Sequence, residues 1–254
     1  MNLEILISTM NSKFQKRNLN LTVSHLLIDQ LTEKDEKGLA KSRNRAILLA
    51  QKDICLISDD DLEYFNDLEE NIIKSFKDNM EADIITFCVQ TPDNQPYKRY
   101  KEKSFWHTKK TIMRVSSVEI AFRLDSINKV NLRFDERFGL GSNFPTGEEI
   151  IFLSDALDKG LKILYIPINI VIHPIESSGK NYESIKLIEA KGAMFYRLFG
   201  FLGYGVSVLF AFKKSKESPY SLIKFYKLMI NGIIKFRRKN IWIVKYQKMK
   251  LMIF

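Results

Sequence analysis

The sequence predicts an α/β protein with a mostly parallel central sheet flanked by helices. Apolar runs of strand length alternate, in the first half of the chain, with segments whose apolar residues recur at helical spacing. That alternation is typical of a sheet covered by helices. An acidic cluster directly follows one apolar run, and sheets of this kind bind ligands beyond the carboxyl ends of their strands.

The first half of the chain supplies four expected strands and two expected helices. Gly38–Gln51 (GLAKSRNRAILLAQ) predicts a helix because its apolar residues share one face and its basic residues lie opposite. The polar residues 11–20 predict a loop or a short helix. The expected strands are Leu3–Ser8, Leu21–Ile28, Asp53–Ile57 and Ala82–Val89, and the second helix is Phe65–Asn79.

The second half of the chain alternates less regularly. Its expected elements are a strand or hairpin over Ile112–Arg123, a glycine-containing loop over Asp135–Phe144, a helix over Glu148–Lys159 closed by Gly160, a strand over Leu161–Ile166 ended by Pro167, and a short strand over Asn169–His173.

Composition narrows the class of protein. Six prolines and 11 glycines exclude a collagen-like or low-complexity chain. Cys55 and Cys88 both lie inside apolar runs, which favours two buried thiols in a reducing compartment over a disulfide scaffold. The start of the chain carries Glu4 and no basic stretch before a long apolar core, so it does not resemble a signal peptide. We therefore expect a cytoplasmic protein.

Positive charge is concentrated at the carboxyl end. Residues 213–254 hold 12 lysines and arginines against one acid, so this tail is near +11 and the rest of the chain near −1, given a total of +10. We expect two domains, 1–189 and a basic amphipathic helical region over 190–254. The tail is the part that would meet an anionic partner.

Ser58 is followed by three aspartates, Asp59, Asp60 and Asp61, at the end of an apolar strand. Side chains alternate along extended chain, so Asp59 and Asp61 are expected to point the same way. Two converging carboxylates repel each other unless a cation lies between them, and Mg²⁺ or Mn²⁺ binds one or two carboxylates together with substrate phosphates. An acidic turn that caps the next helix is an equally good interpretation of the triplet alone.

Together with this triplet, several ordered segments resemble the family 2 glycosyltransferases. The segments are LEILIST, LLID, GLAKSRNRAILLAQKDICLISDDD, FDERFGLGSNFPTGEEIIF and IPINIVIH, which span residues 3–173. The resemblance implies a GT-A fold, in which a Rossmann-like sheet binds a sugar nucleotide, and a metal-dependent, inverting transfer of the sugar to a hydroxyl group. UDP is the nucleotide and Mn²⁺ or Mg²⁺ the metal that the resemblance implies.

The resemblance also implies roles for individual residues. Glu149, beside Glu148, would be the catalytic base, and Asp61 the principal metal ligand. The residues implied to hold the nucleotide or diphosphate are Asp29, Lys41, Arg43, Asp59 and Asp60, and those implied to hold the metal besides Asp61 are Asp59 and His173.

Each of these roles competes with a simpler one. Glu148 and Glu149 open a helix, where acidic residues are favoured by the helix dipole alone. His173 follows a strand and could simply be packed, and Arg43 could belong to a solvated helix face. Phe105 and Trp106 could stack against a sugar, or they could pack the loop that carries them against the main domain.

The tail mixes aromatic and aliphatic residues with its lysines and arginines, a composition typical of helices that lie in a membrane surface. Its uncharged stretch, Leu198–Phe212, is 15 residues long, and a membrane-spanning helix needs about 20. Packing on the main domain is the alternative. Membrane association would suit a polyprenyl-diphosphate-linked glycan acceptor in bacterial polysaccharide synthesis, with the enzyme peripheral on the inner face of the cell membrane.

Two other functions fit parts of the pattern. A sugar-nucleotide nucleotidyltransferase could use a related sheet and would release pyrophosphate. A nucleic-acid-binding protein would explain the basic aromatic tail but not the acidic strand end, so we expect no nucleic-acid partner.

Overall fold

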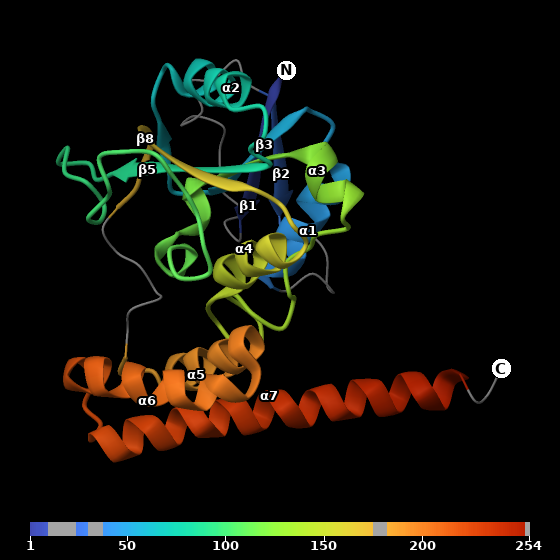
Figure 1. The fold of residues 1–254 in the computed structure, drawn as a ribbon, viewed down its shortest axis with the longest axis vertical. Coiled ribbons are helices and arrows are strands. Elements are labelled where there is room, and N and C mark those ends of the chain that lie inside the picture. Colours follow the sequence, from blue (N-terminus) through green and yellow to red (C-terminus); the bar gives the residue numbers. More distant parts are fainter. Residues whose placement is uncertain (10–23, 30–37, 175–181, 252–254) are drawn as a thin grey trace. The chain divides into compact units, whose positions relative to one another are not determined.

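The structure is a computed structural model that describes residues 1–9, 24–29, 38–174 and 182–251 (Figure 1). The chain divides into two compact units: a sheet unit of Met1–Glu136 with Glu148–Ser177, and a helical unit of Arg137–Gly147 with Ser178–Phe254. The expected boundary at residues 189/190 falls inside a helix of the second unit. The expected loop over residues 11–20 lies outside the described residues.

The sheet unit is the mixed α/β fold that the sequence predicts. Its strands are β1 (Leu3–Thr9), β2 (Ser24–Asp29), β3 (Ile54–Asp59), β4 (Glu63–Tyr64), β5 (Ile84–Gln90), β6 (Phe105–Trp106), β7 (Ile120–Arg123) and β8 (Ile163–Ile172). Its helices are α1 (Leu39–Leu49), α2 (Leu68–Asp78), α3 (Leu124–Lys129) and α4 (Glu148–Asp158), with 3₁₀ turns at Ile112–Arg114 and Ser117–Glu119.

The described strands form one sheet in the order β2-β1-β3-β7-β5-β8-β4, and β6 pairs with β8. The five longest strands, β1, β2, β3, β5 and β8, all run in the same direction, because β7 is antiparallel to both β3 and β5. Their carboxyl ends therefore meet at one edge of the sheet. Thr9 pairs with Asp29 there, and Ser8 pairs with Asp59.

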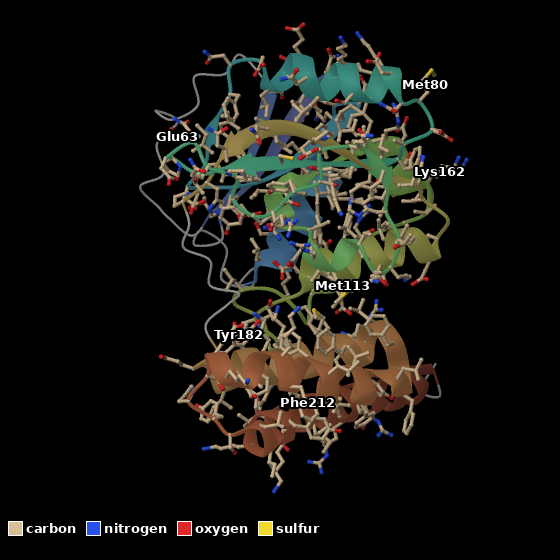
Figure 2. The ribbon with its side chains drawn as sticks, turned by 60° about the vertical axis from the view of Figure 1, so that its left-hand side comes forward. Glu63, Met80, Met113, Lys162, Tyr182 and Phe212 are labelled. Atoms are coloured by element: carbon tan, nitrogen blue, oxygen red, sulfur yellow. The ribbon has the colours of Figure 1, made fainter. Side chains whose placement is uncertain are left out.

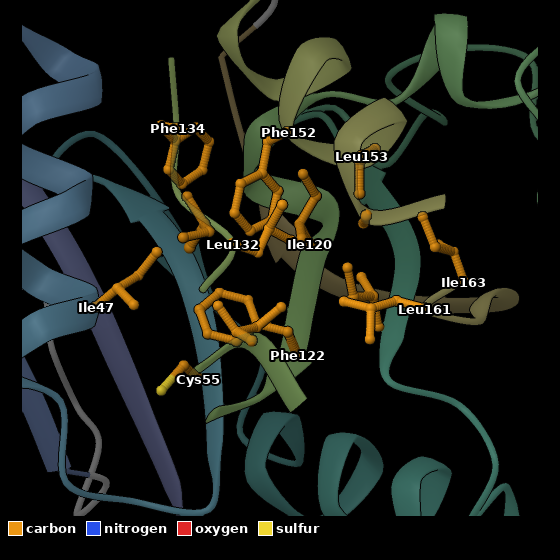
Figure 3. Packing of buried hydrophobic residues seen from close by; sticks show 14 of the residues in the cluster. Ile47, Cys55, Ile120, Phe122, Leu132, Phe134, Phe152, Leu153, Leu161 and Ile163 are labelled. Atoms are coloured by element: carbon orange, nitrogen blue, oxygen red, sulfur yellow. The ribbon is translucent and has the colours of Figure 1, made fainter. Parts of the chain in front are cut away.

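Buried side chains alternate between the two faces of the sheet. In β1, Leu6 belongs to a core cluster shared with α1 and α4, whereas Ile5 and Ile7 belong to a cluster shared with α2. Figure 3 shows the first cluster, where Phe122 of β7 and Phe152 of α4 are 6.2 Å apart between ring centroids. Because the two faces are both covered, the sheet edge is the part of the sheet left for a ligand.

Two sequence-based expectations for the sheet unit were wrong. Ile112–Arg123 is not a strand or hairpin throughout: two 3₁₀ turns precede the four-residue strand β7. Pro167 does not end its strand, because β8 continues to Ile172. The register against β5 shifts between Thr86 and Cys88, so the proline, which cannot donate a ladder hydrogen bond, falls in an irregular part of the pairing.

The helical unit contains α5 (Ile185–Phe199), α6 (Gly203–Lys214) and α7 (Leu222–Leu251). Two glycines let α5 and α7 cross at close range. A Cβ built at Gly232 would lie 1.8 Å from the carbonyl oxygen of Glu189, and one at Gly192 would lie 2.1 Å from that of Met229. Any larger residue at either position would force the helices apart.

By length and composition alone, the stretch Ile185–Glu217 could cross a membrane, because it contains an 18-residue window with a mean hydropathy of 1.5. It is not one straight helix, because the chain turns at Gly200, whose φ is +56°, and α6 then packs against α5. Phe195 of α5 and Phe210 of α6 lie 5.2 Å apart between ring centroids. Within the described residues, this stretch is thus a helical hairpin packed on itself.

Candidate active site

The carboxyl edge of the sheet gathers the acidic triplet. Asp59 is the last residue of β3, and Asp60 and Asp61 form the turn that follows it. Strand alternation places Asp59 on the same face as Cys55 and Ile57, which is the face that α1 covers. The three carboxylates then diverge: Asp59 contacts α1, Asp60 accepts a hydrogen bond from Thr9, and Asp61 faces the end of β8.

Arg43 of α1 lies at the centre of this edge. Its guanidinium donates from Nη2 to Asp59 Oδ1 at 2.9 Å and from Nη1 to Glu148 Oε1 at 3.1 Å, and its side chain is 1% exposed. Burial by itself would lower the pKa of Arg43, but Asp59 and Glu148 together raise it, so the guanidinium stays charged. Arg43 therefore joins the acidic triplet to the start of α4. Both terminal nitrogens of Arg43 bind protein carboxylates, and a contact between Arg43 and a nucleotide stays a prediction.

The α1 sequence explains why Arg43 points inward. Ala40, Ala46 and Ile47 bury one side of the helix against the sheet, and Arg43 falls on the same side. Ser42 donates to Ser8 of β1, 2.9 Å away between hydroxyl oxygens, which fixes this turn of the helix against the first strand.

Asn44 was not singled out by the sequence. Its side chain bonds both to the backbone of Phe134, whose N–H lies 2.7 Å from Asn44 Oδ1, and to Glu136. Consecutive residues of α1 thus hold two distant parts of the chain, Asn44 the segment ending at Glu136 and Arg43 the helix beginning at Glu148. Only the tertiary structure brings these two segments to the same helix.

Glu148 and Glu149 stand in the first turn of α4, as predicted. Glu148 is buried and Glu149 is half-buried, and their side chains share a hydrogen bond. Burial, and next the charge of Glu149, raise the pKa of Glu148 to about 8, and Arg43 offsets only part of this. Glu148 therefore keeps its proton well above the pH range of an ordinary glutamate, and Glu149 is the more accessible of the two residues.

Asp61 and His173 meet on the other side of the triplet, with Nε2 of His173 4.0 Å from Asp61 Oδ1. Burial raises the pKa of Asp61, and His173 acts in the opposite direction. Nδ1 of His173 lies against the carbonyl oxygen of Pro174, which can only accept, so Nδ1 carries a hydrogen and Nε2 is left to face Asp61.

Two aromatic residues that the sequence did not single out complete this side of the site. The ring of Tyr97 lies 5.2 Å from that of His173, and the hydroxyl of Tyr64 lies 2.5 Å from Ser58. Burial raises the pKa of Tyr64 to about 12. Tyr97 comes from the polar excursion after β5, and nothing local in that sequence indicates that it returns to the sheet edge.

Other predicted or candidate residues lie apart from this group. Lys41 is exposed in the first turn of α1, and Asp29 ends β2 at the correct edge, although its side chain is outside the described part. Phe105 and Trp106 pair with β8 at Tyr165 and Leu164, far along that strand from His173. Trp106 borders a cavity of about 270 Å³ at the opposite end of the sheet.

His107, which also lies in the excursion after β5, has a structural role. His107 is buried and bonds to Thr86 and Thr111, and burial lowers its pKa to about 4. Both cysteines are buried and free, as predicted.

No three histidine, cysteine, aspartate or glutamate side chains among the described residues form a ready-made metal cluster. The pair of Asp61 and His173 nevertheless fits a cation that takes most of its ligands from elsewhere. Mg²⁺ and Mn²⁺ commonly bind one or two protein carboxylates and fill the other positions with water and phosphate oxygens. A histidine ligand usually donates its second nitrogen to a carbonyl, which is the arrangement of His173 and Pro174.

The family model described as glycosyl transferase family 2 matches residues 28–144. The chain is similar in structure to S. aureus TarS 1–349, with 11% identity and a TM-score of 0.56 over 94% of this chain and 74% of that one. TarS 1–349 in complex with UDP-GlcNAc gives 12% identity and a TM-score of 0.56 over 83% and 71% of the two chains. No curated protein sequence matches this chain.

The fold of the sheet unit is that of the GT-A glycosyltransferases. More particularly, the model that matches residues 28–144, a little less than half of the chain, is that of the family 2 glycosyl transferases, which agrees with the resemblance found in the sequence. The matched region contains Arg43 and the acidic triplet, and it ends just before Glu148.

The raised pKa of Glu148 has a consequence for stability. A carboxyl whose folded pKa lies above its unfolded value, about 4.3 for glutamate, stabilises the folded state at low pH, and this contribution is lost as pH rises through the folded value. We therefore expect the melting temperature of the wild type to fall between about pH 5 and pH 8–9 relative to that of Glu148→Gln, which has no such proton to lose. Thermal unfolding of both proteins across this range measures the difference, and parallel curves would contradict the assignment.

Proposed function

We propose that this protein is a metal-dependent inverting glycosyltransferase that moves a sugar from a nucleoside diphosphate donor, UDP being the expected nucleotide, to a hydroxyl of a glycan acceptor. The observation that carries the proposal is the link from Asp59 through Arg43 to Glu148, which joins the acidic turn and the pair of acids through one buried arginine. The similar structures of TarS with UDP and with UDP-GlcNAc support a sugar nucleotide as donor.

The donor would lie along the carboxyl edge, where Thr9, Asp29 and Asp59 end neighbouring strands. Nε of Arg43 is buried without a hydrogen-bond partner among the described residues. A buried N–H group without a hydrogen-bond acceptor costs about 1–3 kcal/mol, so we expect a water or an oxygen of the sugar nucleotide beside Nε. Asp61 and His173 would hold the metal, which would neutralise charge developing on the departing diphosphate.

Glu149 is the proposed base. It takes the proton of the acceptor hydroxyl while that oxygen bonds to the anomeric carbon, and the bond from that carbon to the diphosphate breaks with the electron pair leaving on the nucleoside diphosphate. Glu148 supports this step without contacting the acceptor. It is buried, bonds to Arg43 and shares a hydrogen bond with Glu149, so it fixes the orientation of the half-buried carboxylate.

We expect Glu149→Gln to abolish transfer while donor affinity stays within about twofold, because the base acts only on the acceptor.

Asp61→Asn should abolish transfer and also remove the stabilisation that Mn²⁺ adds to donor binding. A thermal-shift panel of nucleotide sugars with and without Mn²⁺ measures binding, and product analysis measures transfer.

The product identifies the reaction class. Release of a nucleoside diphosphate supports glycosyl transfer, whereas release of pyrophosphate would make the protein a nucleotidyltransferase. Full turnover by Glu149→Gln would remove the role assigned to that residue. Glu70→Gln, which changes an exposed acid of α2, is the control for charge loss.

The acceptor is proposed to be lipid-linked and the enzyme to bind the anionic inner face of the cell membrane. The helical unit exposes large apolar residues beside lysines: Phe201, Leu202, Leu209, Phe212 and Ile223 are each more than 60% exposed, and Phe212 is labelled in Figure 2. Lys213, Lys216, Lys224 and Lys227 are exposed beside them in the chain. Exposed apolar groups flanked by cations favour the surface of an anionic bilayer.

We expect the double variant Phe201→Asp, Phe212→Asp to lose binding to vesicles that contain anionic lipid, measured by flotation. Each change removes an inserted apolar side chain and adds a repelled charge. Met80→Asp, which alters an exposed apolar residue of the sheet unit, should float as the wild type does. Unchanged flotation of the double variant, or binding to nucleic acid and not to vesicles, would overturn the membrane proposal.

A further inference from the structure

His173, the proposed histidine of the metal site, contacts several segments at the carboxyl edge of the sheet. Its backbone N–H donates to the carbonyl of Gln90 at 2.8 Å, which continues the pairing of β8 with β5. Its Nδ1 lies against the carbonyl of Pro174, and its Nε2 faces Asp61 at 4.0 Å. The ring of Tyr97 lies 5.2 Å from the imidazole, with 55° between the ring planes. The hydrogen bonds thus fix the backbone and Nδ1, and Tyr97 packs against the ring.

The excursion that carries Tyr97 turns back at once towards β5, the strand it leaves. Thr91 N–H donates to the carbonyl of Gln95 at 2.8 Å, and Asn94 N–H donates to that of Thr91 at 2.9 Å. Asn94 has φ +60°, a conformation that asparagine tolerates better than most residues. Tyr97 N–H then donates to the carbonyl of Val89 at 3.0 Å. This turn places Tyr97 beside the end of β5.

The buried carboxylate of Glu119 fastens the residues that follow Tyr97. Its side chain is 3% exposed, and it accepts hydrogen bonds from Lys98 Nζ at 2.5 Å and from the hydroxyl of Tyr100 at 2.9 Å. The Tyr100 hydroxyl in turn accepts from the backbone N–H of Val89 at 3.1 Å. Separating this stretch from the sheet would leave a buried carboxylate without its partners, which is costly. Tyr97 is therefore held from both of its ends.

The ring of Tyr97 also packs against the core cluster shared with α2, which includes Phe87 and Val171. It thus contacts both the core and the imidazole of His173. This matters because the last torsion of a histidine side chain has broad minima, so its own rotamer preference fixes the ring orientation only weakly. A packed neighbouring ring restricts that torsion.

We propose that Tyr97 is a positioning residue of the metal site: it holds the imidazole of His173 in the orientation in which Nε2 faces an ion bound by Asp61. The proposal rests on the metal role given to His173 and Asp61 under the proposed function. Tyr97 acts through His173 and is assigned no contact with the ion. Groups that orient a metal-binding histidine typically change metal affinity by about 10- to 100-fold.

The test measures the concentration of Mn²⁺ that half-saturates the full chain at one fixed concentration of UDP. Water-proton relaxation, which changes when Mn²⁺ binds to a protein, supplies the signal. We expect Tyr97→Ala to raise the half-saturating concentration by about 10- to 100-fold, because the imidazole loses its fixed orientation. Tyr97→Phe keeps the ring and should bind Mn²⁺ as the wild type does. The affinity for UDP in EDTA, measured by calorimetry, should be the same for all three proteins.

Ile73→Ala is the matched control. It shortens a half-buried side chain of α2 that packs against the same core cluster as Tyr97, and it should leave the half-saturating concentration unchanged. If Tyr97→Ala does not fold, Tyr97→Leu keeps an apolar side chain on the cluster but removes the flat ring, and the same rise is expected. A variant of Tyr97 that binds Mn²⁺ as the wild type does, or an equal rise for Ile73→Ala, would overturn the proposal.

The proposed function can fail separately. His173→Ala, measured alongside, reports on the metal site itself. If this variant binds Mn²⁺ as the wild type does, the metal role of His173 is wrong and the positioning role of Tyr97 falls with it. If His173→Ala weakens Mn²⁺ binding while Tyr97→Ala and Tyr97→Leu do not, only the positioning role is wrong.

Discussion

The buried guanidinium of Arg43 is the interaction on which the site depends. It is charged, 1% exposed, and bonded to Asp59 on one side and Glu148 on the other. Removing the Asp59 carboxylate is expected to cost about 3–5 kcal/mol, because the buried guanidinium charge left behind is uncompensated. The two carboxylates lie 89 residues apart in the chain, and the arginine makes the position of each depend on the other.

The sheet brings the other parts of the candidate site together. Its five long parallel strands end at one edge, and this alone brings Thr9, Asp59 and the end of β8 together. Helix α1 then covers one face with Ala46 and Ile47 and delivers Arg43 to that edge. A metal and a diphosphate would occupy the same edge on the Asp61 side, which leaves the Glu148 side for the acceptor.

Much of the fold and of the candidate site could be predicted from the sequence, because the patterns that indicate them lie within short segments. The apolar runs give the long strands, the helical spacing over residues 38–51 gives α1, and the position of Asp59 follows from the end of β3. Glu148 and Glu149 were found where a helix starts. Composition and spacing do not, however, distinguish a helix-capping glutamate from one that bonds to a buried arginine.

The remaining features depend on contacts between distant segments. Tyr97 reaches His173 from an excursion that has no periodicity, and Asn44 binds a segment 90 residues away. Pro167 was expected to end a strand, but an irregular stretch of the pairing accommodates it. The segment 137–147 is predicted as an isolated glycine-containing connection, and only the fold shows that Phe138 and Phe144 in it pack against Phe236.

The most direct measurement is a double-mutant cycle between Arg43→Met and Glu148→Gln, followed by the free energy of unfolding and by kcat/KM for transfer. If the guanidinium joins the acidic turn to the acid pair, the two changes will be coupled by about 1–3 kcal/mol in both quantities, the range seen for residues in one buried network. Additive effects in both would show that Arg43 and Glu148 act independently, and would contradict the account.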